Sequence, residues 1–231
     1  MTPAEVSDAL VEAARGVVAE GGPAVEVPGE VLVLACGAGV FESPVGLVLG
    51  ITPEAIAERV GGTVTGRGFV RVEVPAADVV EAILRDPGYG TARVPRFGWD
   101  DRPRSFENPG FSVRYAYARA CWVGRWGAEL GVGEGSLRDP EPAELRLVGV
   151  LGEVPGRAAQ AEREGDARPL AFCLERVAGA YHDVHERCPA VPLGDEEPGA
   201  VHAGRAGLAR AVRVALGNGL KMIGETPRER I

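Results

Sequence analysis

Residues 108–119 read NPGFSVRYAYAR, and from this stretch onward the sequence has the pattern of an all-helical protein. We predict a first helix over Val113–Trp126. Asp139-Pro140 is typical of a capping residue followed by the first residue of a helix, so it predicts the start of a second helix. Pro169 predicts the start of a third.

The third predicted helix has apolar residues at alternating steps of four and three, which is the spacing of a buried helix seam. The seam consists of Leu170, Leu174, Val177, Tyr181, Val184 and Cys188. A polar loop over Pro189–Ala203 separates it from a final helix, in which Leu208, Val212 and Leu216 share one face. We expect that helix to stop at Asn218-Gly219, because glycine is common directly after a helix end.

The residues before this helical part predict a small α+β unit. Thr2 and Glu5 form a capping box with Pro3 at the first helical position, which predicts a helix to about Glu20. We expect short strands at Val25–Val27 and Glu30–Leu34, on either side of Pro28-Gly29.

Three further elements complete this unit. Thr52-Pro53-Glu54 predicts the start of a second helix. Val64-Thr65 and Phe69–Val74 predict a hairpin, with its turn at residues 66–68, Gly-Arg-Gly. Pro75 then opens a closing helix that ends near residue 86.

The predicted fold class is therefore an α+β N-terminal domain followed by an all-α helical bundle. The expected boundaries are 1–90 for the first domain, 91–107 for a basic, Pro-rich linker without helical periodicity, and 108–231 for the bundle.

Composition is that of an ordinary soluble protein, with 45% hydrophobic and 25% charged residues. The first ten residues carry two acids and no basic residue, unlike a signal peptide, and no apolar run is long enough to span a bilayer. The four cysteines are widely scattered, which favours reduced thiols in the cytoplasm over a disulfide framework. We expect no membrane and no DNA partner.

Net charge is −8, which argues against bulk attraction to nucleic acid. Residues 91–126 and 203–231 are nevertheless basic, while residues 1–90 and 127–202 are acidic. The two basic segments are either one local patch or two solvated helix faces, and charge alone favours the second interpretation.

Two local motifs suggest chemistry, and the sequence supports neither. His182-x-x-His185 with Glu186 and Cys188 nearby resembles a metal site, but Cys188 belongs to the apolar seam and no second ligand pair is present. Residues 131–136, GVGEGS, follow no strand, and their third glycine is misplaced for a phosphate loop. We predict no metal, no cofactor and no catalytic residue.

The stretch 108–119 resembles the opening of the anticodon-binding helical domain of arginyl-tRNA synthetases, whose pattern is close to N-P-x-F-x-V-Q-Y-A-H-A-R. Residues 180–188, AYHDVHERC, look like the family's A-F-H-x-F-Y-N-R-C. Residues 211–220 resemble its last long helix, and residues 225–231 resemble its ending.

The first ninety residues are similar to the N-terminal domain of the same family. Residues 39–47, GVFESPVGL, look like its G-D-Y-A-S-x-V-A-L, and residues 66–72, GRGFVRV, look like its G-P-G-F-I-N-I. In the family a Rossmann-type catalytic domain follows the Tyr-Gly that matches Tyr89-Gly90, whereas here the basic linker follows at once. None of the three histidines lies in an H-x-G-H motif, and Lys221 is the single lysine, so ATP activation has no residues to carry it.

The resemblance implies two tRNA contacts. The N-terminal hairpin would place Phe69 and Arg71 at the D-loop, where Phe69 keeps a stacking surface and Arg71 replaces an asparagine. The helical domain would hold the unstacked anticodon. There Arg114, Tyr117 and His185 replace a glutamine, a histidine and a tyrosine of the family pattern. The expected tRNA-binding residues of this domain are Arg114, Tyr117, Arg119, His182, His185, Arg187, Arg213 and Arg230.

The resulting hypothesis is a tRNA-binding protein that does not aminoacylate, has an accessory or regulatory role, and contacts the anticodon stem-loop of arginine tRNA together with the D-loop. The alternative is a protein-interaction module that kept the fold and lost the RNA, which the acidic N-terminal domain and the substituted contacts support. An enzyme of new activity is the third hypothesis, and no catalytic constellation supports it.

Overall fold

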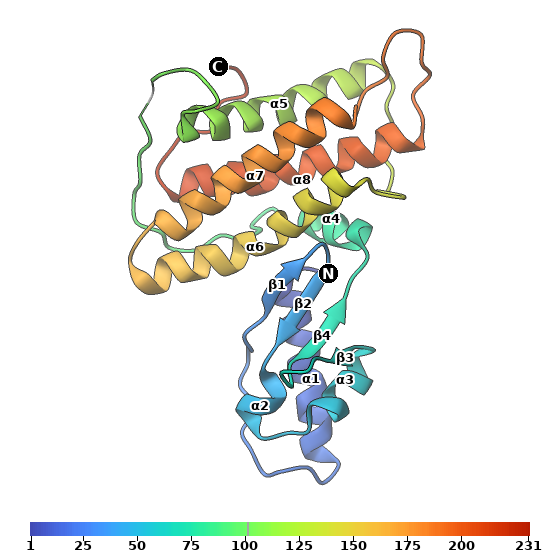
Figure 1. Cartoon of the computed structure of the whole chain (residues 1–231), viewed down its shortest axis with the longest axis vertical. Helices are drawn as coiled ribbons and strands as arrows, with labels where there is room; N and C mark the ends of the chain where they lie inside the picture. The colour runs from blue at the N-terminus through green and yellow to red at the C-terminus, as the bar shows by residue number, and fades with distance from the viewer. Residues whose placement is uncertain (101) are drawn as a thin grey trace.

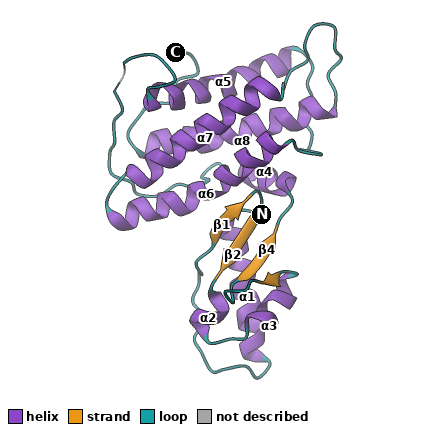
Figure 2. Cartoon of the chain, in the orientation of Figure 1, coloured by secondary structure: helices purple, strands orange, loops and turns teal. Residues whose placement is uncertain are grey.

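The computed structural model describes residues 1–100 and 102–231. Figure 1 shows a small sheet with helices beside it, and above it a layer of long helices that carries the C-terminus. All strands lie in the first part, as the orange arrows in Figure 2 show. The predicted fold class, α+β followed by all-α, is confirmed.

The N-terminal part begins with α1 (Pro3–Ala19), and the predicted capping box of Thr2 and Glu5 is present. The sheet is antiparallel with strand order β1-β2-β4-β3. Its strands are β1 (Leu34–Gly37), β2 (Val40–Ser43), β3 (Thr63–Val64) and β4 (Val70–Glu73), and its helices are α2 (Val45–Leu49) and α3 (Pro53–Val60).

The strands predicted at Val25–Val27 and Glu30–Leu34 are wrong, because the hairpin forms one turn later, around Gly39. Gly39 has a φ of 69° and its carbonyl accepts from Val74 N–H, and a Cβ there would lie 1.9 Å from the Val74 oxygen. The sharp turn and the close approach to the end of β4 both require glycine. The predicted β3–β4 hairpin and the closing helix α4 (Ala76–Arg85) are confirmed.

The helical part consists of α5 (Pro109–Glu129), α6 (Pro142–Glu164), α7 (Arg168–Arg187) and α8 (Ala200–Met222). The six seam residues of α7 are all buried, as predicted. The second helix starts at Pro142 instead of Pro140, since Glu141 and Glu144 make the capping box.

The predicted end of the last helix at Asn218-Gly219 is also wrong, because α8 continues to Met222. Gly219 serves packing instead of termination. A Cβ at this position would lie 2.3 Å from Leu174 Cδ2, so glycine lets α8 approach α7 closely. The break comes later, at Gly224, which has a φ of 87°.

A proline inside α6 leaves one backbone carbonyl free to accept a hydrogen bond from the N-terminal part. Pro155 lies inside α6 and has no N–H, so it cannot donate the usual helical hydrogen bond to the Leu151 carbonyl. The buried Tyr89 hydroxyl donates to that carbonyl over 2.8 Å. The Asn218 side chain of α8 donates to the Pro87 and Tyr89 carbonyls at 2.9 and 3.1 Å. The end of the N-terminal part is thereby held against α6 and α8, and the hydrophobic core runs through both parts.

Residues 91–100 form no helix or strand and lie along the helical part. Phe97 N–H donates to the Ile223 carbonyl over 3.0 Å, and the Trp99 indole N–H donates to Glu175 over 2.8 Å. All four cysteines are free, and three of them, Cys121, Cys173 and Cys188, are buried. Within the described residues, no helix has the combined length and apolar character needed to cross a bilayer.

Candidate nucleic-acid interface

A groove with a volume of about 400 Å³ lies between α5, α7 and the last residues of the chain. On α5, Tyr115, Arg119 and Trp122 follow one another at steps of four and three, so they share a face of the helix. The residues that line the groove are Tyr115, Ala118, Arg119, Trp122, Arg125, His185, Glu229, Arg230 and Ile231.

Arg119 is the central cation of this groove. Its guanidinium carbon lies 4.7 Å from the centre of the Tyr115 ring and 5.7 Å from that of Phe106. One of its Nη atoms lies 3.3 Å from His182 Nδ1. It forms an ion pair with Glu186 at 3.9 Å, and the Glu186 side chain is 65% exposed to solvent. Ring contacts therefore orient Arg119, while its charge is only weakly neutralised.

Two histidines of α7 flank Arg119. His182 Nε2 lies 3.2 Å from both the carbonyl and the hydroxyl oxygens of Ser112, which holds the imidazole under Arg119. His185 lines the groove, and its ring centre lies 6.0 Å from that of Trp122. Burial lowers the pKa of both imidazoles and the charge of Arg119 lowers them further, so both are neutral at pH 7.

The C-terminal residues close one side of the groove. Arg125 Nη1 lies 3.0 Å from Glu229 Oε2, in a pair whose members are both at least one-third exposed. Arg230 and Ile231 line the same side. The Glu229 carboxylate thus already makes a charge-assisted hydrogen bond with Arg125.

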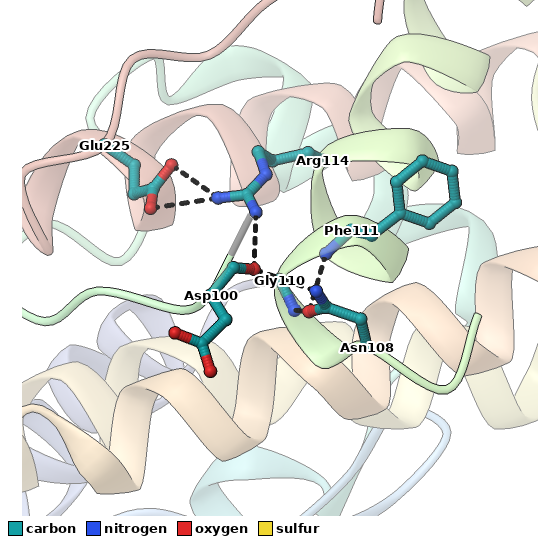
Figure 3. A network of polar contacts seen from close by, with 6 residues as sticks. All are labelled: Asp100, Asn108, Gly110, Phe111, Arg114 and Glu225. Atoms are coloured by element: carbon teal, nitrogen blue, oxygen red, sulfur yellow. Dashed lines mark hydrogen bonds and ion pairs between the residues drawn. The ribbon is translucent and has the colours of Figure 1, made fainter. Parts of the chain in front are cut away.

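Figure 3 shows how Arg114 is held between Glu225 and the Asp100 carbonyl. Its Nη1 donates to both carboxylate oxygens of Glu225 at 3.0 and 3.1 Å, and its Nη2 donates to the Asp100 carbonyl over 3.2 Å. Asn108 caps α5 by accepting from Gly110 and Phe111 N–H, and its amide donates to the same Asp100 carbonyl. Arg114 therefore joins the linker, α5 and the C-terminal segment. It lines a second groove of about 400 Å³ together with Arg104 and Arg228.

The remaining predicted residues of the helical part lie outside the first groove. Tyr117 is two residues from both Tyr115 and Arg119, so it faces away from them and contacts α8, where a Cβ on Gly217 would lie 3.1 Å from its ring. Arg213 is an exposed residue of α8 close to Tyr117. Arg187 is exposed in the last turn of α7.

Phe69 and Arg71 lie on the β3–β4 hairpin of the N-terminal part, away from the groove. Phe69 is half-buried. Arg71 donates from Nε and Nη2 to Glu42 Oε1 on the neighbouring strand, at 2.9 and 2.6 Å. The hairpin thus carries both residues expected to contact tRNA, Phe69 and Arg71, but Arg71 is already paired with Glu42.

The structure brings together Arg119, His182, His185 and Arg230 of the predicted residues. Sequence reasoning missed Tyr115, Trp122, Arg125 and Ile231. The helical spacing around Arg119 could have identified the three on α5, whereas only the fold places the C-terminal segment against that helix. Among the described residues, no group of three or more His, Cys, Asp or Glu side chains could hold a metal ion.

Comparison with known proteins agrees with the helical architecture. The DALR anticodon binding domain family matches residues 113–231, just over half of the chain. An arginine–tRNA ligase of Clavibacter sepedonicus is 39% identical over 132 residues, which cover 55% of this chain and 24% of that protein. Thermus thermophilus arginyl-tRNA synthetase aligns at 24% identity and a TM-score of 0.45, covering 55% of this chain and 22% of its own. The chain therefore spans about a quarter of the length of these relatives.

Proposed function

Because the chain belongs to the DALR anticodon binding domain family, we propose that it binds the unpaired anticodon bases of a tRNA in the groove between α5 and α7. Arginine tRNA is the proposed tRNA, since a relative that is 39% identical over 132 residues is an arginine–tRNA ligase. Anticodon loops present bases that are read by stacking and by hydrogen bonds to their edges.

The observation that carries this proposal is the position of Arg119. It lies over Tyr115, beside His182, with one weakly held acid as its ionic partner. Such a guanidinium offers donors to a base edge or a phosphate, and Tyr115, Trp122 and His185 offer ring surfaces within the same groove.

We further propose that the protein does not aminoacylate and acts in an accessory or regulatory role. The family match is confined to residues 113–231, and the sequence has no H-x-G-H motif and a single lysine. Purified protein should therefore show no arginine-dependent exchange between ATP and pyrophosphate. Exchange that follows this chain through purification would overturn this part of the proposal.

The proposed domain boundaries remain 1–90, 91–107 and 108–231. The continuous core and the Tyr89 contact support a close association of the two parts in solution. Limited proteolysis tests the boundaries, because residues 91–100 and 102–107, which form no helix or strand, should be cut before any helix of the bundle. First cuts within α6 or α7 would contradict them.

Titration of labelled arginine tRNA and an unrelated tRNA across a salt series tests the binding proposal. Log affinity should fall linearly with log salt, by about 0.7 per phosphate contact on a single strand. Arginine tRNA should bind more tightly than the unrelated tRNA at every salt concentration. Negligible binding of both tRNAs at low salt would favour the second candidate, a protein-interaction module, which the pairing of Arg71 with Glu42 and of Arg125 with Glu229 supports.

A further inference from the structure

Two tryptophans continue the face of α5 beyond the groove. Trp122 lines the groove and is 38% exposed, and Trp126, one turn further, is 44% exposed. Their ring centres lie 5.9 Å apart with the planes inclined by 49°. Leu130 follows at the next turn and is 43% exposed. This row of Trp122, Trp126 and Leu130 is an apolar strip on the surface, which is costly unless something covers it.

The indole N–H groups of Trp122 and Trp126 differ from that of Trp99 in their hydrogen bonding. Within the described residues, neither indole N–H has a hydrogen-bond acceptor, whereas the Trp99 indole donates to Glu175 over 2.8 Å. Tryptophan N–H groups with a structural role usually find a partner. Trp99 holds the linker against α7, while Trp122 and Trp126 are in no comparable contact.

The row of aromatic residues from Tyr115 to Trp126 on α5 is longer than a stack of three bases. A rise of 1.5 Å per residue places Trp126 about 16 Å from Tyr115 along the axis of α5. Stacked nucleotides of one strand are spaced by about 3.4 Å, so a stacked base triplet spans about 7 Å. A triplet seated near Tyr115 and Arg119 therefore leaves Trp126 facing the nucleotides beside it.

We propose that Trp122 and Trp126 form a stacking platform for an unpaired base next to the anticodon triplet. This proposal rests on the proposed function of the groove. Trp122 belongs to both the groove and the strip, so a strand leaving the groove meets Trp126 directly. Arg125, between them in sequence, is paired with Glu229 at 3.0 Å, and a phosphate beside the stacked base would have to displace that carboxylate to contact it.

The test uses the full chain and the anticodon stem-loop of arginine tRNA, intact or with one abasic nucleotide at each unpaired position outside the triplet in turn. Trp126→Ala should weaken binding of the intact stem-loop by about 5- to 150-fold, which corresponds to about 1–3 kcal/mol for one stacked base. Trp126→Phe should retain most of the affinity. Leu130→Ala, which removes an equally exposed apolar side chain from the next turn, should change it little.

One abasic position should weaken wild-type binding to the same extent, and Trp126→Ala should cause no further loss on that RNA. This non-additivity distinguishes stacking on one base from a general loss of affinity. Equal binding by wild type and Trp126→Ala, or an equal loss on every abasic RNA, would overturn the platform while leaving the groove in place. If wild-type protein binds no stem-loop at all, the proposed function fails and the platform fails with it.

Discussion

The groove on α5 and the β3–β4 hairpin both place an aromatic ring near an arginine, but they leave the arginine in different states. In the groove, the ionic partner of Arg119 is Glu186, which is 3.9 Å away and mostly exposed. On the hairpin, Arg71 makes two hydrogen bonds to Glu42, whose side chain is only 15% exposed. A nucleic acid would meet a weakly paired arginine in the first region and an arginine already bound to a carboxylate in the second.

This difference shows that residue type alone does not identify a binding site. The ring and the arginine are present in both regions, and the neighbouring element decides whether the charge is available. In the sheet, the antiparallel register sets Arg71 directly opposite Glu42. In the helical part, α7 presents His182 to Arg119, and that neutral imidazole orients the guanidinium without cancelling its charge.

In the comparison of the groove with the hairpin, the largest expected effect is that of removing the Arg119 side chain. Arg119→Ala should weaken tRNA binding by about 10- to 100-fold, because it removes a charge-assisted contact and uncovers the Tyr115 ring. Titration of labelled arginine tRNA gives the affinity. Arg163→Ala, which removes an exposed arginine from α6, is the matched control and should have little effect. A larger loss of tRNA affinity from Phe69→Ala than from Arg119→Ala would make the hairpin, and not the groove, the main binding site.

The hydrogen bond from Tyr89 to α6, which joins the N-terminal part to the helical part, should contribute to stability and not to tRNA binding. Tyr89→Phe leaves the buried Leu151 carbonyl without its donor and should lower the free energy of unfolding by about 1–2 kcal/mol. Urea denaturation followed by circular dichroism measures this change. Tyr115→Phe, which removes a hydroxyl that has no hydrogen-bond partner within the described residues, should leave stability unchanged. The Tyr89→Phe variant should bind tRNA as tightly as wild type under conditions in which both are fully folded. Weaker binding under those conditions would contradict the prediction.

The carboxylate of Glu229 should oppose binding. Glu229→Gln removes the charge that Arg125 already contacts, so tRNA affinity should rise by about 2- to 5-fold, the size expected for an exposed ion pair. Glu42→Gln on the hairpin is the comparison variant. If the hairpin contacts tRNA as well, freeing Arg71 should give a gain of similar size, and no change there combined with a gain at Glu229 would assign the contact to the groove.

The smallest expected effect concerns protonation of the histidines. Burial and the charge of Arg119 lower the pKa of His182 and His185 in the folded state, so the unfolded chain binds more protons as the pH falls below about 6.5. As the pH falls from about 6.5 toward the folded-state pKa values, the free energy of unfolding should therefore decrease. Above about pH 6.5, these two histidines should have little effect on it. NMR titration of the imidazole signals measures both pKa values. Folded-state values at or above about 6.5, the ordinary pKa of a histidine side chain, would contradict the prediction.

The sequence predicted the fold class, the capping box of α1 and the seam of α7, because each depends on local periodicity or on neighbours within one turn. It misplaced the first hairpin and the end of α8, because Gly39 and Gly219 serve contacts with residues distant in sequence. The same limit applies to the candidate site. Tyr115 and Trp122 follow from the helical spacing around Arg119, whereas the pairing of Arg125 with Glu229 depends on the path of the C-terminal segment.

The proline inside α6 has a consequence for how this molecule tolerates change. Pro155→Ala would be expected to improve α6 as an isolated helix, since a new N–H could donate to the Leu151 carbonyl. That same hydrogen bond would compete with the Tyr89 hydroxyl for its acceptor. A substitution that makes one element more regular would then loosen the association of the two parts, so the irregularity of α6 is a requirement of the assembled protein and not a defect of the helix.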